Sequence, residues 1–567
     1  MTSGDSRESA LRPAPSDNRR AGRTVLFAAR SATALHRLLD TLPVFAGDDR
    51  IARRFTLVPG SDFDAEALAA VERAGARTLP WERARAGSFD LIVAASPKGE
   101  LRALRGALAL LPHGAGFGKS LPGEGTPGAP SGLDPAFLLT GGTTLATRHA
   151  LAHPDQLTRL AGTSPRAAAH AVVVGDPTLE RLLAAVGHRD RYRAALGTGA
   201  RRLVVLTSTW GPESLLRQRP DLVTELLALL GYDGYQLALV THPNERSRRG
   251  SYDLEQGLGP ALDAGLVLPG PHAEWATLLV AADAVVTDHG STALYAAALG
   301  RRVVTAYDGG DELLADSPTG QLLAASPRLT AADALPGVLD RVLAAPRAPA
   351  ALAAADAAFA HRGRALELLR DELYGLLGLA PTGPAPSPEP LPVPARPPRQ
   401  PAAFLVEAEL AGDRVTVARF PPWRTRPARF LAAEQGVAGE RHAQSAGLLY
   451  RRRSDHQGGA HRVAWTATGW IDAALRDHPG CATAGVLLSQ TRALLRRRGG
   501  PPLVLELAPR PCAGRLIHTD PAAALCAAHV WLAATPGAPA TFTADIGGHT
   551  FPVTLRPATP AEAEQLL

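Results

Sequence analysis

The sequence predicts an α/β protein with two consecutive doubly wound units and a separate, small α+β unit at the C-terminal end. Short apolar runs alternate with helical segments from about residue 24 to residue 380, the pattern of a parallel sheet covered on both faces. A proline-rich stretch then interrupts the chain, and hairpin patterns replace the alternation beyond it. The length of 567 residues is enough for about three domains.

The first unit is expected at residues 23–198. It follows a polar tail at residues 1–22 that we expect to be disordered, because this tail has too few apolar residues to bury a core. Each strand is expected where a short apolar run lies between helical segments. These runs lie at residues 25–29, 54–58, 90–95, 107–111 and 171–174.

The second unit, at residues 199–380, repeats the same rhythm. Its apolar runs lie at residues 202–207, 236–241, 266–268, 284–287 and 302–307. Two such units in succession imply a cleft between them, because ligands bind at the carboxyl ends of the strands in sheets of this type. The residues that follow these strands are therefore the candidates for a binding site.

Residues 381–401 are dominated by proline and are expected to form an extended, semi-rigid linker. The α+β unit, at residues 402–567, is expected to begin with a hairpin around Gly412-Asp413 and to end with one around Gly547-Gly548. Between the two hairpins we expect a helix at 484–498, a strand at 503–507 and a helix at 521–534. The role of this unit is left open.

The charge of the chain favours acidic partners. Its formal net charge is +6 and its pI is near 9.5, which suits nucleotides, phosphorylated polymers or an anionic membrane surface. No nucleic acid is expected, because there is no basic stripe with interleaved aromatic residues. A signal-peptide core and apolar runs of about 18 residues are both missing. We expect a cytoplasmic protein that at most associates peripherally with the inner face of a membrane.

The segment Asp288-His289-Gly290-Ser291-Thr292 lies between a buried strand and an apolar helix. Gly290 allows another molecule to approach the backbone closely, and Ser291 and Thr292 are expected to cap the helix. The first N–H groups of such a helix favour a phosphate. The segment is a candidate for binding donor phosphates; a capped turn without a ligand is the alternative.

His113 comes directly after a buried strand and is followed by a glycine loop that contains Gly114 and Lys119. The pKa of an unperturbed imidazole is near neutrality, so His113 is a candidate general base for an acceptor hydroxyl. Gly114 and Lys119 are expected to lie in the same cleft. A histidine that only ends the strand is the alternative.

Two further candidates follow strands of the second unit. Thr209 comes after the first strand, where its hydroxyl can contact a phosphate or the acceptor. In His242-Pro243-Asn244 the proline ends the strand and fixes the direction of the imidazole. His242 can then hydrogen-bond the phosphates that leave with the donor, and Asn244 is expected nearby.

Asp311 and Glu312 follow the next strand, where a carboxylate can bind ribose or other hydroxyls of the donor. A solvated loop is the alternative. No group of carboxylates has the spacing of a metal site, so we expect a metal-independent reaction without a cofactor. Imidazoles and the start of the helix would then stabilise the departing diphosphate.

Taken together and in this order, the motifs resemble those of the CDP-glycerol glycerophosphotransferase family. In that family a His-Gly pair is followed by a lysine, as at His113-Gly114 and Lys119. A Pro-Thr-Trp-Arg motif is similar to residues 208–211, a His-Pro pair to residues 242–243, and an Asp-Tyr-Ser-Ser turn to residues 288–291. The resemblance covers about residues 90–320. Gly211 replaces the arginine, the lysine loop is one residue longer, and His289-Gly290 replaces Tyr-Ser.

The resemblance implies a GT-B-like pair of Rossmann-type domains and a transferase. A glycerophosphoryl, polyol-phosphoryl or glycosyl group would move from a CDP- or UDP-type donor to a hydroxyl acceptor, which can be polymeric, in cell-envelope polymer synthesis. The implied roles are a base at His113 and phosphate contacts at His242 and the serine turn. A nucleotide-sugar 2-epimerase and a non-catalytic GT-B scaffold with a C-terminal interaction domain are the alternatives. The donor, the acceptor and the oligomeric state are left open.

Overall fold

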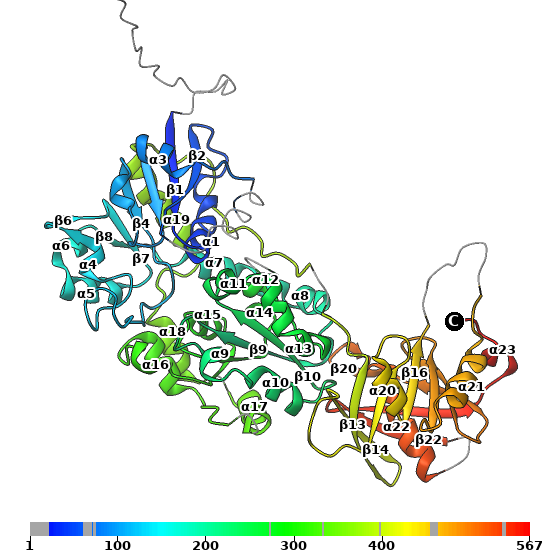
Figure 1. The fold of residues 1–567 in the computed structure, drawn as a ribbon. Helices are drawn as coiled ribbons and strands as arrows, with labels where there is room; N and C mark the ends of the chain where they lie inside the picture. Colours follow the sequence, from blue (N-terminus) through cyan, green and yellow to red (C-terminus); the bar gives the residue numbers. More distant parts are fainter. Residues whose placement is uncertain are drawn as a thin grey trace, which may run out of the picture.

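The computed structural model describes residues 22–60, 71, 75–270, 274–331, 334–346, 348–395, 398–453, 463–535 and 540–567. The tail expected at residues 1–22 lies outside them, apart from residue 22. The described chain forms two sheet-centred lobes and a barrel, which follow one another along the molecule (Figure 1).

The first lobe is built on a parallel sheet of six strands in the order β2-β1-β3-β4-β7-β8. A parallel bridge between Phe55 and Thr78 continues the sheet beyond β2. This is a doubly wound order, whose strand order reverses between β1 and β3. The strands are β1 (Arg23–Ala29), β2 (Ile51–Leu57), β3 (Leu91–Ala94), β4 (Ala107–Leu110), β7 (Arg148–Leu151) and β8 (Ala171–Val173).

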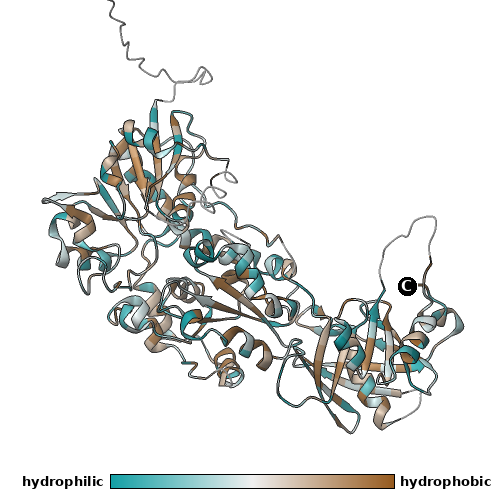
Figure 2. Ribbon diagram, in the orientation of Figure 1, coloured by the Kyte–Doolittle hydropathy of each residue, from teal (hydrophilic) through white to brown (hydrophobic). Residues whose placement is uncertain are grey.

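The second lobe repeats the same winding. Its parallel sheet has the order β10-β9-β11-β12, and bridges at Ala238–Val267 and Thr305–Arg328 extend it at both edges. The strand expected at 266–268 is present only as the first of these bridges. The order reverses between β9 and β11. The strands, apolar in Figure 2, are β9 (Arg202–Ser208), β10 (Tyr235–Thr241), β11 (Ala284–Thr287) and β12 (Arg302–Thr305).

Helices connect the strands of both lobes. Those from the first part of the chain are α1 (Ala32–Leu39), α3 (Trp81–Ala86), α4 (Pro135–Leu138), α5 (Pro154–Thr163), α6 (Pro165–Ala168), α7 (Pro177–Ala184) and α8 (Arg189–Ala195). The later ones are α9 (Leu215–Gln218), α10 (Leu222–Leu229), α11 (Pro243–Arg249), α12 (Ser251–Gly257), α13 (Gly259–Asp263), α14 (Glu274–Ala281), α15 (Thr292–Ala298), α16 (Pro318–Ala325), α17 (Leu335–Ala344), α18 (Pro349–Asp356) and α19 (Ala365–Leu377).

Helix α19 returns to the first lobe although it follows the second lobe in the sequence (Figure 1). Leu369 and Leu373 are buried in the same core as Phe27 of β1. The hydroxyl of Tyr374 donates a hydrogen bond to Asp48 Oδ2 at 2.9 Å. The segment 365–377, expected within the second unit, therefore completes the core of the first.

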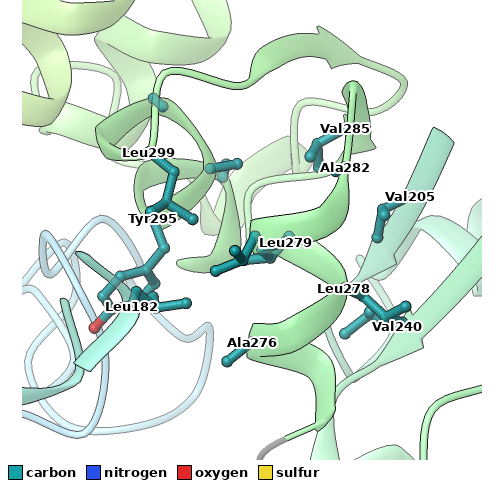
Figure 3. Close-up of a cluster of buried hydrophobic side chains, with 14 of the residues drawn as sticks. Leu182, Val205, Val240, Ala276, Leu278, Leu279, Ala282, Val285, Tyr295 and Leu299 are labelled. Carbon is teal, nitrogen blue, oxygen red and sulfur yellow. The ribbon is translucent and has the colours of Figure 1, made fainter. Parts of the chain in front are cut away.

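The two lobes share a buried apolar core. Leu182 of α7 packs there with Leu278 and Leu279 of α14, and Tyr295 of α15 reaches toward Leu182 (Figure 3). The hydroxyl of Tyr295 donates to Asp176 Oδ2 at 2.7 Å. Because dense packing joins α7 to α14 and α15, the walls of the space between the lobes are fixed by side chains of both.

The proline-rich linker is extended, and it lies against both lobes. Arg181 donates hydrogen bonds to the carbonyls of Glu389 and Pro390, at 2.9 and 3.1 Å. Thr277 Oγ1 donates to the carbonyl of Pro392 at 2.8 Å, and Leu391 is buried between these contacts. The linker is thus held against the surfaces of both lobes by hydrogen bonds and by the buried Leu391.

The C-terminal unit is a closed barrel, which corrects the expected α+β arrangement. Described strands of the unit close in the order β13-β14-β22-β23-β19-β18-β17-β16-β15. They are β13 (Ala403–Ala411), β14 (Arg414–Phe420), β15 (Phe430–Glu434), β16 (Leu448–Arg452), β17 (Thr483–Leu487), β18 (Arg492–Arg497), β19 (Pro502–Leu507), β22 (Ala540–Ile546) and β23 (His549–Pro557). A hairpin of β20 (Arg510–Cys512) and β21 (Arg515–Ile517) and helices α20 (Glu440–Ser445), α21 (Ala467–Asp477) and α23 (Pro560–Ala563) complete the unit.

Helix α22 (Pro521–Ala534) fills the interior of the barrel. It packs against β13, β14, β16, β17, β18, β19 and β22. A helix that is apolar on all sides is stable only when it is surrounded by other elements. The expected helix at 521–534 is confirmed, and its position leaves the barrel interior occupied by protein.

The helix expected at 484–498 is wrong. These residues form β17 and β18, joined by a turn in which the Thr491 N–H donates to Ser489 Oγ. Alanine, leucine and arginine favour a helix locally. Here the two strands cover α22 so closely that a Cβ at Gly485 would lie 3.0 Å from Leu525 Cδ1. The tertiary contact outweighs the local preference.

An ion pair joins the barrel to the second lobe. The fully buried guanidinium of Arg419 on β14 donates to both carboxylate oxygens of Asp233, at 2.9 and 2.6 Å. Its Nη2 also lies 2.9 Å from Asp520 Oδ2, just before α22.

Within the described ranges, no helix is both long and apolar enough to span a membrane.

Candidate functional site

A cleft of about 1250 Å³, including space open to solvent, lies between the two lobes. It is at the carboxyl ends of β1 and of β9 to β11, where the strand order of each lobe reverses. Such positions are the usual ligand sites of doubly wound sheets. The first lobe contributes Thr33, His36, Arg37, Asp40, Thr178 and Arg181 to the walls. The second contributes Ser208, Thr209, His242, Gly290, Ser291 and Thr292.

The charged side chains that line the cleft are mainly basic. Asp40 is the one carboxylate among the described lining residues, and Arg181 Nη1 and Thr178 Oγ1 donate to it at 2.7 and 2.5 Å. Arg37 and Arg246 line the cleft as well, so arginines outnumber carboxylates in its described lining. The cleft is therefore suited to an anionic ligand.

His242 presents a neutral N–H donor to the cleft. As the first residue before α11, its Nδ1 accepts a hydrogen bond from the Asn244 N–H at 3.1 Å. The proton of the neutral ring is then on Nε2, the nitrogen that remains for a ligand. Burial, followed by the charge of Lys119, lowers the pKa of His242 well below its usual value. Asn244 itself is buried on α11 and does not line the cleft.

His113 lies in the loop after β4 and, contrary to the expectation, is not one of the lining residues of the cleft. Burial, followed by the charges of Lys98, Arg37 and Lys119, lowers its pKa to about 4. The next residue, Gly114, is so close to the serine turn that a Cβ there would lie 3.4 Å from Ser291 Oγ. The His-Gly loop and the serine turn therefore lie next to each other.

Lys119 links the two lobes. Its Nζ donates to Thr209 Oγ1 at 2.8 Å and lies 3.5 Å from Glu312 Oε2. Beside it, the Leu314 N–H donates to the Gly118 carbonyl and the Ser120 N–H to the Glu312 carbonyl, both at 2.9 Å. Burial lowers the pKa of Lys119, against the opposing effect of Asp288 and Glu312. Lys119 thus holds the loop after β4 against the second lobe.

Asp288 and His289 are buried beneath the turn after β11, where they stabilise it, and they do not line the cleft. Both are buried, and Asp288 accepts hydrogen bonds from the N–H groups of Thr209, Leu215 and Gly290 at 2.8, 3.0 and 2.9 Å. His289 Nε2 lies 3.0 Å from Glu312 Oε2. The Asp288 carboxylate and His289 Nε2 are used inside the protein, so the cleft surface of the turn is left to Gly290, Ser291 and Thr292.

Asp311 and Glu312 also lie away from the cleft lining. Asp311 is exposed, whereas Glu312 is buried beneath the turn. Burial by itself would raise the pKa of Glu312, but the hydrogen bond with His289 and the charge of Lys119 outweigh it and lower the pKa. Glu312 is therefore an ionised partner of these two residues.

Ser291 stands at the N-cap position of α15 but does not cap it, which differs from the expectation. Its backbone is helical and its side chain makes no capping hydrogen bond. The hydroxyl instead lies toward Gly114, and both Ser291 and Thr292 line the cleft. Their hydroxyls are placed to contact a ligand.

His36 and Arg37 on α1 were missed by the sequence analysis. Helix α1 buries Ala34, Leu35 and Leu38 in the first lobe, so His36 and Arg37 fall on its other face and line the cleft. A signal was available, because α1 directly follows the first strand and thus stands at the point where the strand order reverses.

The backbone at Gly211 has a positive φ, which explains why a glycine stands at this position. Gly211 has a φ of +92°, which only glycine adopts without strain. An arginine at this position would need a different turn. Trp210, beside it, has its ring centroid 6.2 Å from that of His242 and packs against this imidazole.

Among the described residues no group of three or more His, Cys, Asp or Glu side chains is placed to hold a metal ion.

Acidification is expected to destabilise the protein through histidines that are neutral in the folded state. Burial lowers the pKa of His149 on β7 from 6.5 to about 4. The unfolded chain then binds more protons between pH 6.5 and 4, so the stability present above pH 6.5 is lost as the pH falls toward 4. At about 1.4 kcal/mol per pH unit, His149 should cost on the order of 1–2 kcal/mol by pH 5. Urea unfolding at pH 7 and 5 measures this loss, which should be smaller in His149→Leu; an equal loss in the variant would contradict the assignment.

No protein-family model and no curated protein matches the sequence. Solved structures with a similar fold include the wall teichoic acid polymerase TagF, with 14% identical residues and a TM-score of 0.46 over 64% of this chain and 90% of that one. A TagF variant soaked with CDPG has 14% identity and a TM-score of 0.44 over 63% and 90% of the two chains. HepE from Anabaena in complex with UDP has 16% identity and a TM-score of 0.38 over 63% and 100%.

Proposed function

We propose that the protein is a GT-B-type transferase that moves a glycerophosphoryl, polyol-phosphoryl or glycosyl group from a nucleotide-diphosphate donor to an acceptor hydroxyl. One observation carries the proposal. A single cleft lies where the strand order reverses in both lobes, and imidazole, hydroxyl and guanidinium donors surround it with almost no opposing carboxylate. This combination suits a phosphorylated ligand whose charge changes during reaction.

The donor diphosphate would bind to the second lobe. The hydroxyls of Ser291 and Thr292 and the Nε2–H of His242 face the cleft, and Gly290 allows the phosphates to approach the backbone. Hydrogen-bond donors fixed in this way stabilise the negative charge that grows on the departing nucleotide. Asp288, His289 and Glu312 would support this turn from below.

The acceptor hydroxyl would be deprotonated by His113. Its oxygen forms a bond to the transferred group, the bond from that group to the nucleotide phosphate breaks, and the proton passes to the imidazole. The pKa of His113 is lowered to about 4, because burial and nearby cations oppose its protonation. A bound diphosphate would offset the charges of Arg37 and Lys119 and raise this pKa toward the range of an effective base.

An epimerase is less well supported. It would need a side chain in the cleft that moves protons to and from the sugar, and Asp40, the one lining carboxylate among the described residues, is held by Arg181 and Thr178. The test is direct. Incubation of a nucleotide sugar without any acceptor would convert it in an epimerase and leave it unchanged in a transferase.

Binding of CDP and UDP should stabilise the protein against heat. A ligand at a hundred times its dissociation constant adds about 2.7 kcal/mol to the free energy of unfolding. Thermal melts with CDP, UDP and the free nucleosides measure the effect, which should require the phosphates. Ser291→Leu should abolish it by filling the cleft, whereas the exposed Asp311→Asn is the matched control and should keep it. The absence of any shift with both nucleotides would remove the proposal and leave a scaffold.

A further inference from the structure

Arg37 is a cation that lines the cleft, and part of its guanidinium group has no hydrogen-bond partner. It lies on α1 and lines the cleft, with its guanidinium carbon 5.0 Å from the centroid of the Tyr295 ring. Its Nη1 is buried and has no hydrogen-bond partner. A buried guanidinium N–H that is left unpaired is costly, so such a group marks a place where a ligand atom is expected.

The carboxylates near Arg37 are already engaged by other groups. Asp40 accepts from Arg181 and Thr178, and Asp176 accepts from the Tyr295 hydroxyl and the Leu179 N–H. Burial would lower the pKa of Arg37, but Tyr295, Asp176 and Asp40 outweigh it and raise the pKa above its usual value. Arg37 therefore remains charged while its Nη1 stays available.

Arg37 also lies close to both imidazoles of the site. Its charge contributes to the lowered pKa of His113 and of His242, which belong to different lobes. Helix α1 packs directly against α11, which begins after His242. Arg246, another guanidinium of the lining, is held by the carbonyl of Pro269 at 2.8 Å. Arg37 therefore lines the cleft where α1 meets α11 of the second lobe.

We propose that Arg37 binds a phosphate group of the ligand across the cleft from Ser291, so that a cation of the first lobe clamps an anion held on the second. A guanidinium presents two parallel N–H groups that match two phosphate oxygens, which a lysine cannot reproduce. The proposal rests on the function proposed above and adds the residue that couples the lobes to the ligand. The phosphate can belong to the donor diphosphate or to a phosphorylated acceptor.

Calorimetric titration with pyrophosphate, CDP and UDP tests the role of Arg37. Arg37→Gln should weaken the binding of pyrophosphate by about tenfold to a hundredfold, and Arg37→Lys should recover part of the loss. Arg85→Gln, which removes an exposed arginine of the first lobe paired with Glu82, is the matched control and should bind as the wild type does. Thermal melts of the unliganded variants separate a loss of binding from a loss of folding.

The outcomes distinguish the source of the phosphate. An equal loss for CDP and UDP, with no loss for a phosphorylated acceptor, assigns Arg37 to the donor. Unchanged nucleotide binding with a raised KM for glycerol 3-phosphate, but not for glycerol, assigns it to the acceptor. Unchanged pyrophosphate, nucleotide and acceptor parameters in a folded Arg37→Gln variant would overturn the proposal. If the wild type binds pyrophosphate but no nucleotide, the transferase proposal fails and the pyrophosphate comparison still decides the role of Arg37.

Discussion

His113→Ala is expected to lower the rate of group transfer by about 10²- to 10⁴-fold, the usual contribution of a positioned general base. His113 is in the loop after β4, whose Gly114 lies close to Ser291, and its lowered pKa keeps the ring neutral, as a proton acceptor must be. The donor contacts proposed above are made by other residues, so nucleotide binding should persist. Single-turnover transfer and nucleotide titration on the same variant measure the two properties separately.

The control is His170→Ala, which removes an exposed histidine of the same lobe and should leave the rate unchanged. The dependence of the wild-type rate on pH gives a second check. The rate should rise with pH through the pKa of His113 in the complex and then level off, because only the neutral ring accepts a proton. Transfer that survives in His113→Ala would place the base elsewhere in the cleft.

Arg419→Ala should destabilise the protein by about 3–5 kcal/mol, because it removes one partner of a buried ion pair and leaves an uncompensated charge. Arg419 is fully buried between Asp233 of the second lobe and Asp520 of the barrel. Its loss should also loosen the attachment of the barrel. Denaturant unfolding followed separately by tryptophan fluorescence and by protease sensitivity of the barrel would detect both effects.

Arg414→Ala is the matched comparison on the same strand. Its pair with Asp545 is exposed, with 53% of the arginine side chain accessible, so we expect a loss of less than about 1 kcal/mol. Equal losses for the two variants would show that the pair at Arg419 is worth no more than a surface contact. A double variant, Arg419→Met with Asp233→Leu, should regain most of the stability, since Asp520 keeps its ion pair with Arg452 at 3.1 Å and Asp233 leaves no unpaired charge.

The sequence predicted correctly those helices and hairpins whose bounds are set by a few neighbouring residues. The hairpins β13–β14 and β22–β23 turn at the expected glycines, because those turns need a positive φ. Helix α22 has the expected bounds, since aspartate precedes a proline at its first position and apolar residues follow without a break. The segment 484–498 was misassigned, because its residues favour a helix until the barrel closes around α22.

For the candidate site, too, the sequence predicts some properties and the tertiary structure determines the others. The positions of Thr209, His242 and residues 290–292 at one edge follow from strands that run parallel, and the sequence shows where such strands end. Their roles do not follow from it. That Asp288 and His289 serve the turn from inside depends on hydrogen bonds to Thr209, Leu215 and Glu312, residues far away in the sequence.

The sequence by itself determined two doubly wound lobes and the edge at which a ligand can bind, because apolar periodicity and strand ends are local properties of the chain. Only the tertiary structure decided that α19 returns to the first lobe, that the C-terminal unit closes into a barrel, and that Arg37 lines the same cleft as the serine turn. The physical reason is that burial and pairing depend on which segments meet, and these segments lie more than a hundred residues apart.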